Sequence, residues 1–251
     1  MDRRTFLAGT GAMLVAAPLR ANESTENVRI PLRPLAGMRL PYRNDVVTMA
    51  SGPSREIVDK HTVAFVLDVL ALDASGCLLN VTLDGTLLPV TARLSHSADL
   101  EELVFDASVT ESRRQYLAGL LIAKLTRFSV VNAHSWASDE SRPAVLSVPL
   151  GWESLAPAMR INFVGDVTFR RIGTIFGRSA AEFDLNCVIR PRISGLAANL
   201  ELTGHYWADL ATGFLLRLSL AGVGNVSAGG KTARVEQTQE DVLVLEDSKG
   251  L

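Results

Sequence analysis

The chain of 251 residues has few cysteines, no excess of one charge and no apolar run long enough to cross a membrane. Two cysteines in a chain of this length exclude a small module stapled by disulfides. Lysine and arginine number 25 against 27 for aspartate and glutamate, which excludes a strongly basic nucleic-acid binder. Hydrophobic residues make up 47% of the chain, enough to build a core and to exclude a disordered chain.

The first residues have the pattern of an export signal. Arg3 and Arg4 precede a short apolar stretch, and small residues then follow up to Ala21. A charged region, an apolar region and a small-residue region in this order are typical of a cleaved signal peptide. The apolar stretch is shorter than the roughly 20 residues of a membrane-spanning helix. We therefore expect cleavage near Ala21, which would remove residues 1–21 and leave residues 22–251 in the periplasm with no membrane span.

The Arg-Arg-x-Phe-Leu block at residues 3–7 resembles the twin-arginine (Tat) export signal of bacteria. Asp2 stands where Ser or Thr is typical of that signal, and Ala8 stands where Lys is common. An ordinary Sec signal is the alternative, so the expected partner in export is the Tat or the Sec machinery.

The remaining chain is expected to form a single β-rich domain. Apolar and polar residues alternate, as in strands, in a first half at 28–93 and in a second meander at 159–247. Between them, a Ser-x-x-Glu capping box and recurring leucines predict one long helix at 108–128, followed by a proline-containing loop at 129–158. The predicted fold is therefore mainly β with a minor α component: an antiparallel meander, as a half-barrel or open barrel, with one long covering helix.

Residues 73–85 and 210–222 are alike, with six of thirteen positions identical. This indicates a duplicated β unit, and the alternative is that both are ordinary Gly- and Leu-rich meander turns. The meander, its helix and the turn at Asp209–Gly213 resemble the half-barrel group of the LolA/LolB-type periplasmic lipoprotein carriers and several exported families of unknown function. The resemblance implies an exported half-barrel, but no motif is specific enough to transfer binding residues.

Motifs that would identify a reaction are absent or incomplete. Residues 225–232 nearly match a phosphate-binding loop, but the first glycine is missing and a strand-like pattern follows instead of a helix. His61, His96, His134 and His205 show no spacing typical of metal ligands. We therefore predict no catalytic residue, no metal and no cofactor.

The leading hypothesis is a soluble, non-catalytic periplasmic protein whose half-barrel interior binds an apolar small molecule or an acyl chain. The lining residues would come from both halves: Phe65, Leu67, Leu79, Phe163, Phe183 and Phe214. The alternative is that the same residues form a filled core.

Two other hypotheses place the function elsewhere. An accessory or assembly protein for an envelope complex would bind its partner through a face formed by His205, Trp207 and Arg217. A hydrolase would instead use a site built from the loops at 94–107 and 134–158, with a histidine from one of them, His96 or His134, as the base.

Cys77 and Cys187 both fall on predicted inward faces of strands. In an oxidising compartment they could form a disulfide, and two buried free thiols are the alternative.

Overall fold

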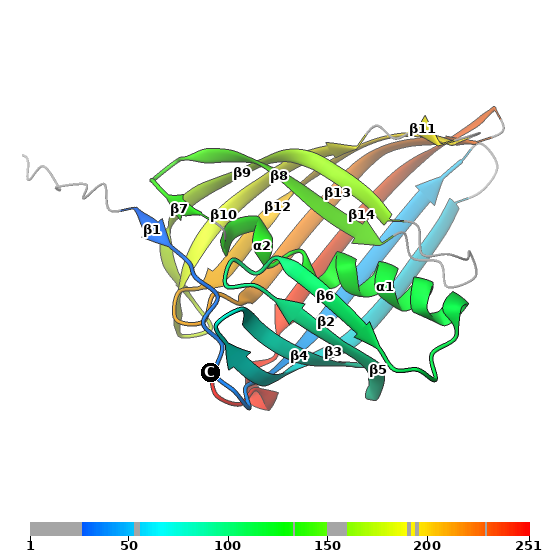
Figure 1. Ribbon diagram of the computed structural model, residues 1–251. Coiled ribbons are helices and arrows are strands. Elements are labelled where there is room, and N and C mark those ends of the chain that lie inside the picture. Colours follow the sequence, from blue (N-terminus) through cyan, green and yellow to red (C-terminus); the bar gives the residue numbers. More distant parts are fainter. Residues whose placement is uncertain are drawn as a thin grey trace, which may run out of the picture.

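The computed structural model describes residues 27–52, 56–132, 134–149, 160–189, 192–193, 196–228 and 230–251. Within them the protein is mainly β, and one large antiparallel sheet curls into a trough without closing into a barrel (Figure 1). This confirms the predicted fold class, a mainly β half-barrel with a minor helical part. The expected signal peptide at 1–21 lies outside the described residues.

The first part of the chain supplies one side of the large sheet as a meander. Its strands are β2 (Arg39–Ser51), β3 (Glu56–Asp73), β4 (Gly76–Leu83), β5 (Thr86–Leu94) and β6 (Leu100–Phe105). β6 occupies part of the segment 94–107, so the loop expected there is wrong for about half of its length. The exposed pair Glu101 and Glu102 interrupts the apolar alternation, which is why the pattern did not indicate a strand.

The second part of the chain supplies the other side, also as an antiparallel meander. Its strands are β8 (Ser141–Pro149), β9 (Arg160–Ile175), β10 (Arg178–Ile189), β11 (Arg192–Ile193), β12 (Leu196–Asp209), β13 (Leu215–Ala228) and β14 (Lys231–Leu243). β14 pairs with β2 and joins the two meanders into the order β6-β5-β4-β3-β2-β14-β13-β12-β10-β9-β8, with β11 paired to β12. Residues 73–85 contain a turn and β4, and residues 210–222 contain a turn and the first part of β13, while the duplication itself stays a prediction.

The loop expected at 129–158 also contains regular structure. Its described residues include α2 (Ser129–Asn132), β8, and β7 (Ser135–Trp136), which pairs with β1 (Val28–Arg29). Pro143 and Pro149 led to the prediction of a loop at β8, because proline lacks the N–H that a central strand needs. They are tolerated because β8 is an edge strand of the sheet.

The predicted long helix is present as α1 (Glu111–Leu125), and a short 3₁₀ turn, η1 (Leu245–Asp247), follows β14. The predicted capping box does not form, since the N-cap residue is Thr110 and makes no side-chain cap. Ser108 instead donates its hydroxyl to the carboxylate of Asp106, at 2.6 Å. α1 connects the two edge strands in sequence and contacts both β6 and β8, so that it closes the open side of the trough (Figure 1).

Glycines allow the tight curl of β12 and β13. A Cβ at Gly204 would lie 2.1 Å from the carbonyl oxygen of Ser219, and one at Gly224 would lie 2.0 Å from that of Asn199. Only glycine permits so close an approach of the neighbouring backbone, as is usual where a sheet bends sharply.

The two cysteines are buried and free. Cys77 lies in β4 and Cys187 in β10, so the disulfide that the sequence allowed is not formed and the free-thiol alternative holds. Burial raises the pKa of the Cys77 thiol to about 11, which keeps it protonated and unreactive.

A buried ion cluster attaches the end of α1 to the centre of the sheet. Asp241 of β14 is fully buried; Gln239 donates a hydrogen bond to it at 2.9 Å, and the Arg127 guanidinium, just beyond α1, donates another. The ammonium of Lys124 lies 3.6 Å from the other oxygen of Asp241 and donates a hydrogen bond to Asn44 of β2 at 2.8 Å. Since Asn44 pairs directly with Asp241, α1 is bound where the two meanders join.

The cluster contains two cations for one carboxylate. Burial and the nearby Arg127 together hold the pKa of Lys124 well below its usual value, and burial lowers that of Arg127 to about 10. Each cation therefore needs the negative charge of Asp241 in order to stay buried, because a buried charge without a partner is strongly unfavourable.

Replacing Asp241→Ala should lower the free energy of unfolding by about 3–5 kcal/mol, because it leaves Lys124 and Arg127 buried without their counter-charge. Urea denaturation at neutral pH measures this change. Glu236→Gln is the matched control: it removes a carboxylate from the same strand, but from an exposed pair with Arg234, and should cost no more than about 0.5 kcal/mol. Equal midpoints for the two variants would contradict the role given to Asp241.

Candidate functional site on the outer face

The six residues predicted to line an apolar ligand site all belong to one buried core. Phe65 stacks on Tyr42 with ring centroids 4.8 Å apart, and Phe214 meets Phe128 edge-on at 5.5 Å. Phe183 packs in the same way against Trp136, at 5.0 Å. Leu67, Leu79 and Phe163 are buried in the same cluster. These side chains pack against one another and against their neighbours, and a ligand site formed by them stays a prediction.

The three residues predicted as a recognition face do lie together. His205 and Trp207 project from β12, and Arg217 of β13 is the cross-strand partner of Trp207. Their strand neighbours Tyr206 and Leu218 are buried, so the three face outward, away from the trough. With Glu182 and Ser219 they line a surface hollow of about 200 Å³. We call this the outer hollow.

The indole of Trp207 reaches from β12 toward β9 on the outer face. The far edge of its ring is next to Gly173 of β9, where an added Cβ would approach within 3.2 Å. Ala180 of β10, the register partner of both Gly173 and Asp209, is fully buried although it lies on the outer face. The absence of a side chain at Gly173 therefore leaves room for the edge of the ring.

Three polar residues of the outer hollow are paired with side chains beside it. Glu182 accepts a hydrogen bond from Arg171 at 2.6 Å, and Nδ1 of His205 lies 2.8 Å from Asp184. Arg217 pairs with Glu240 at 2.6 Å. These pairs hold the side chains in place, since each partner is on an adjacent strand.

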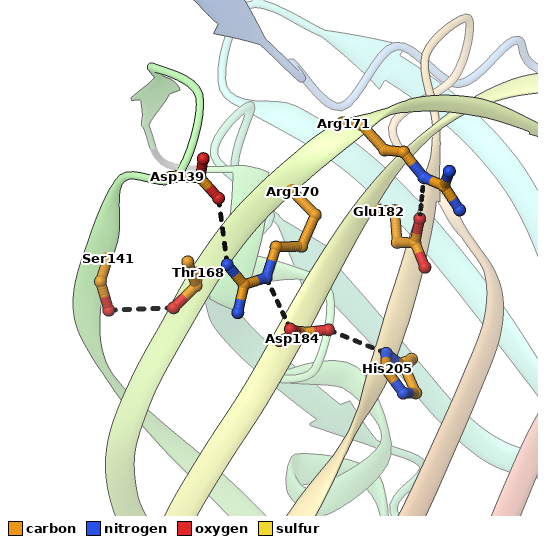
Figure 2. A network of polar contacts seen from close by, with 8 residues as sticks. All are labelled: Asp139, Ser141, Thr168, Arg170, Arg171, Glu182, Asp184 and His205. Atoms are coloured by element: carbon orange, nitrogen blue, oxygen red, sulfur yellow. Dashed lines mark hydrogen bonds and ion pairs between the residues drawn. The ribbon is translucent and has the colours of Figure 1, made fainter.

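Figure 2 shows how this network continues across β9 and β10. Arg170 donates hydrogen bonds to Asp184 at 2.6 Å and to Asp139 at 3.0 Å, and these bonds raise its pKa. On the outer face, one register row of polar side chains crosses eight strands, and we call it the polar row: Ser141, Thr168, Asp184, His205, Ser219, Glu240, Asp45 and Thr62.

Two groups in the outer hollow have unused hydrogen-bonding capacity. Nε of Arg217 is buried and has no partner among the described residues. The hydroxyl of Ser219 likewise makes no hydrogen bond within the described part of the chain. Sequence reasoning missed Ser219, because a lone serine in a strand carries no signal until its neighbours across the sheet are known.

Ser219, His205 and Asp184 are consecutive in the polar row and have the residue types of a nucleophile, base and orienting acid. Acyl transfer also needs free N–H donors for the oxyanion. β13 is paired on both sides at Ser219, so the backbone N–H groups there are used in the sheet. The arrangement therefore suits binding better than nucleophilic catalysis.

The other histidines lie outside this site. His96 and His134 are exposed and do not line the outer hollow. His134 meets the ring of Trp136 edge-on at 6.0 Å. Among the described residues, no group of three or more His, Cys, Asp or Glu side chains is arranged to hold a metal ion. None of the described helices is long and apolar enough to cross a membrane.

No family model and no curated protein sequence matches the chain. Among solved structures, it is similar to one described as lipid–protein interactions in lipovitellin, with 9% identity and a TM-score of 0.45. That match covers 84% of this chain, which spans only 25% of the lipovitellin chain. The chain is also similar to an outer membrane channel from Pseudomonas putida F1, with 10% identity and a TM-score of 0.24. That match covers 86% of this chain and 98% of the channel chain. Likenesses this weak carry no argument about function, which is therefore argued from the residues of this chain.

Proposed function

We propose that this protein is an exported, non-catalytic binding protein that recognises a component of the bacterial envelope through the outer hollow. The observation that supports this proposal is the convergence of Trp207, Arg217 and His205 with Glu182 and Ser219 around one hollow. Tryptophan and arginine are the residue types most enriched at the centres of binding sites. Here they project from adjacent strands of a sheet, which holds them in a fixed geometry.

The export part of the proposal depends on the N-terminal pattern. The paired Arg3 and Arg4, the short apolar stretch and the small residues before Ala21 support passage through the Tat machinery and release into the periplasm.

A second candidate function is the binding of an apolar small molecule or acyl chain inside the trough. The inner face is fully buried where Tyr206 and Asp241 lie. Six residues away along β12, Leu200 is only half-buried, and in the same register row Val235 is half-buried and Ile57 is 46% exposed. This partly exposed apolar row favours an apolar ligand at that end of the trough.

The outer hollow is tested by replacing Trp207→Ala and Arg217→Ala together. We expect the double variant, immobilised on beads, to retain at least about tenfold less of its target from a cell-envelope extract of the source organism, because both anchors are lost. Quantitative mass spectrometry and glycan analysis of the eluate measure the change.

The control for this experiment is Val223→Ala, which shortens an exposed apolar side chain on the same outer face but outside the hollow. It should retain as much target as the wild type. A melting curve checks that each variant folds, since Trp207 is half-buried and packs against the core. Equal retention by the double variant and the wild type would refute the outer hollow as the recognition site.

Export is tested by replacing Arg3→Lys and Arg4→Lys together in the full chain. We expect the wild type in the periplasm with a new N-terminus near Asn22, and the variant retained in the cytoplasm with its leader uncleaved. Cell fractionation and N-terminal sequencing measure both. Normal export of the variant would indicate the Sec route, and a wild-type chain that stays in the cytoplasm would contradict export.

The second candidate predicts a lipid bound to the protein purified from its host. Mass spectrometry of an organic extract should identify it, and its addition to stripped protein should raise the melting temperature by about 5 °C at saturating concentration. Leu200→Glu should abolish the shift, whereas Val223→Ala on the outer face should not. The absence of both a lipid and a shift would eliminate this candidate.

A further inference from the structure

We propose that the outer hollow binds a saccharide, specifically one sugar ring of a glycan chain laid along the polar row. This inference rests on the proposed function, because it names the chemical class of the ligand for the same hollow. Three properties of the hollow support it: its flat aromatic surface, its remaining hydrogen-bonding groups and its size.

The aromatic surface is the indole of Trp207. The far edge of the ring lies beside Gly173 and the residue is only half-buried, so that part of the indole is open to a ligand. The C–H groups on one side of a sugar ring form a flat, weakly apolar surface that stacks on such a ring. A charged or fully apolar ligand would match only part of this site, since polar groups surround the indole.

The hydrogen-bonding groups favour hydroxyls over ions. Glu182 and Arg217 are each already paired with an oppositely charged side chain, and Nδ1 of His205 lies 2.8 Å from Asp184. An ionic ligand would have to break one of these pairs, whereas a neutral ligand leaves them intact. Nε of Arg217 is buried and unpaired, and the hydroxyl of Ser219 can donate and accept. Sugar hydroxyls also donate and accept, so one ring can satisfy the hydroxyl of Ser219.

The size of the hollow indicates a single ring with a chain beyond it. Its volume of about 200 Å³ is below the roughly 300–1,000 Å³ of pockets that enclose a drug-sized ligand. The polar row continues on both sides of His205 and Ser219 with carboxylates and hydroxyls on the same face. Neighbouring sugars would therefore find further hydrogen-bonding partners on the strands beside the hollow.

The experiment uses the capture assay with two treatments of the envelope extract before it meets the immobilised protein. Periodate cleaves the vicinal diols of sugars, and proteinase K, later inactivated, digests proteins. If the outer hollow binds a saccharide, periodate should reduce capture at least about tenfold while proteinase K leaves it within about twofold. The protein-free glycan fraction of the extract should then bind directly in a titration followed by calorimetry.

Matched variants connect this binding to Trp207. Trp207→Phe keeps an aromatic surface and should bind the glycan fraction within about threefold of the wild type, whereas Trp207→Ala should lose about tenfold. Val223→Ala should bind as the wild type does. A melting curve for each variant separates loss of binding from loss of folding.

The outcomes also separate this inference from the proposed function. Capture that resists periodate but is abolished by proteinase K would overturn the saccharide while leaving a binding function for the hollow. Undiminished glycan binding by Trp207→Ala would place the saccharide elsewhere and overturn the inference. No capture from the untreated extract would overturn both.

Discussion

A sheet that curls without closing leaves two edge strands, and the whole structure depends on what covers the gap between them. Here β6 and β8 are the edges, and the chain that links them contains α1, which contacts both. Edge strands that are not covered tend to pair with other chains. The buried carboxylate of Asp241 holds Lys124 and Arg127, so the end of α1 is bound to the strands where the two halves of the chain meet.

This arrangement gives the two faces of the sheet different roles. The inner face is covered by α1 and packs into a core around rings such as Phe183 and Tyr206. The residues between the buried ones point outward by the alternation of a strand. Since the buried neighbours fix the register of β12 and β13, the outward side chains of the hollow have little freedom. A rigid sheet thus positions His205, Trp207 and Arg217 without any loop.

Sequence patterns predicted this outer face well because strand alternation is a local property. The apolar residues around Tyr206 and Leu218 showed which side chains face outward, and β12 and β13 are adjacent in sequence and in the sheet. The same patterns missed β6 and β8, where Glu101, Glu102 and Pro143 interrupt the signal. These are edge strands, which tolerate charges and proline because one side of each is unpaired.

The sequence by itself determined the strand alternation, the position of the one long helix and the outward placement of His205, Trp207 and Arg217, because each depends on residues close together along the chain. Only the tertiary structure decided that β2 pairs with β14. Lys124 looks in the sequence like a surface lysine on a helix, but it is buried beside Asp241 at this junction. The tertiary structure also decided that Glu182 and Ser219 join the outer hollow from β10 and β13. Contacts between distant strands depend on how the sheet is ordered and curled, and no local pattern in the sequence specifies that.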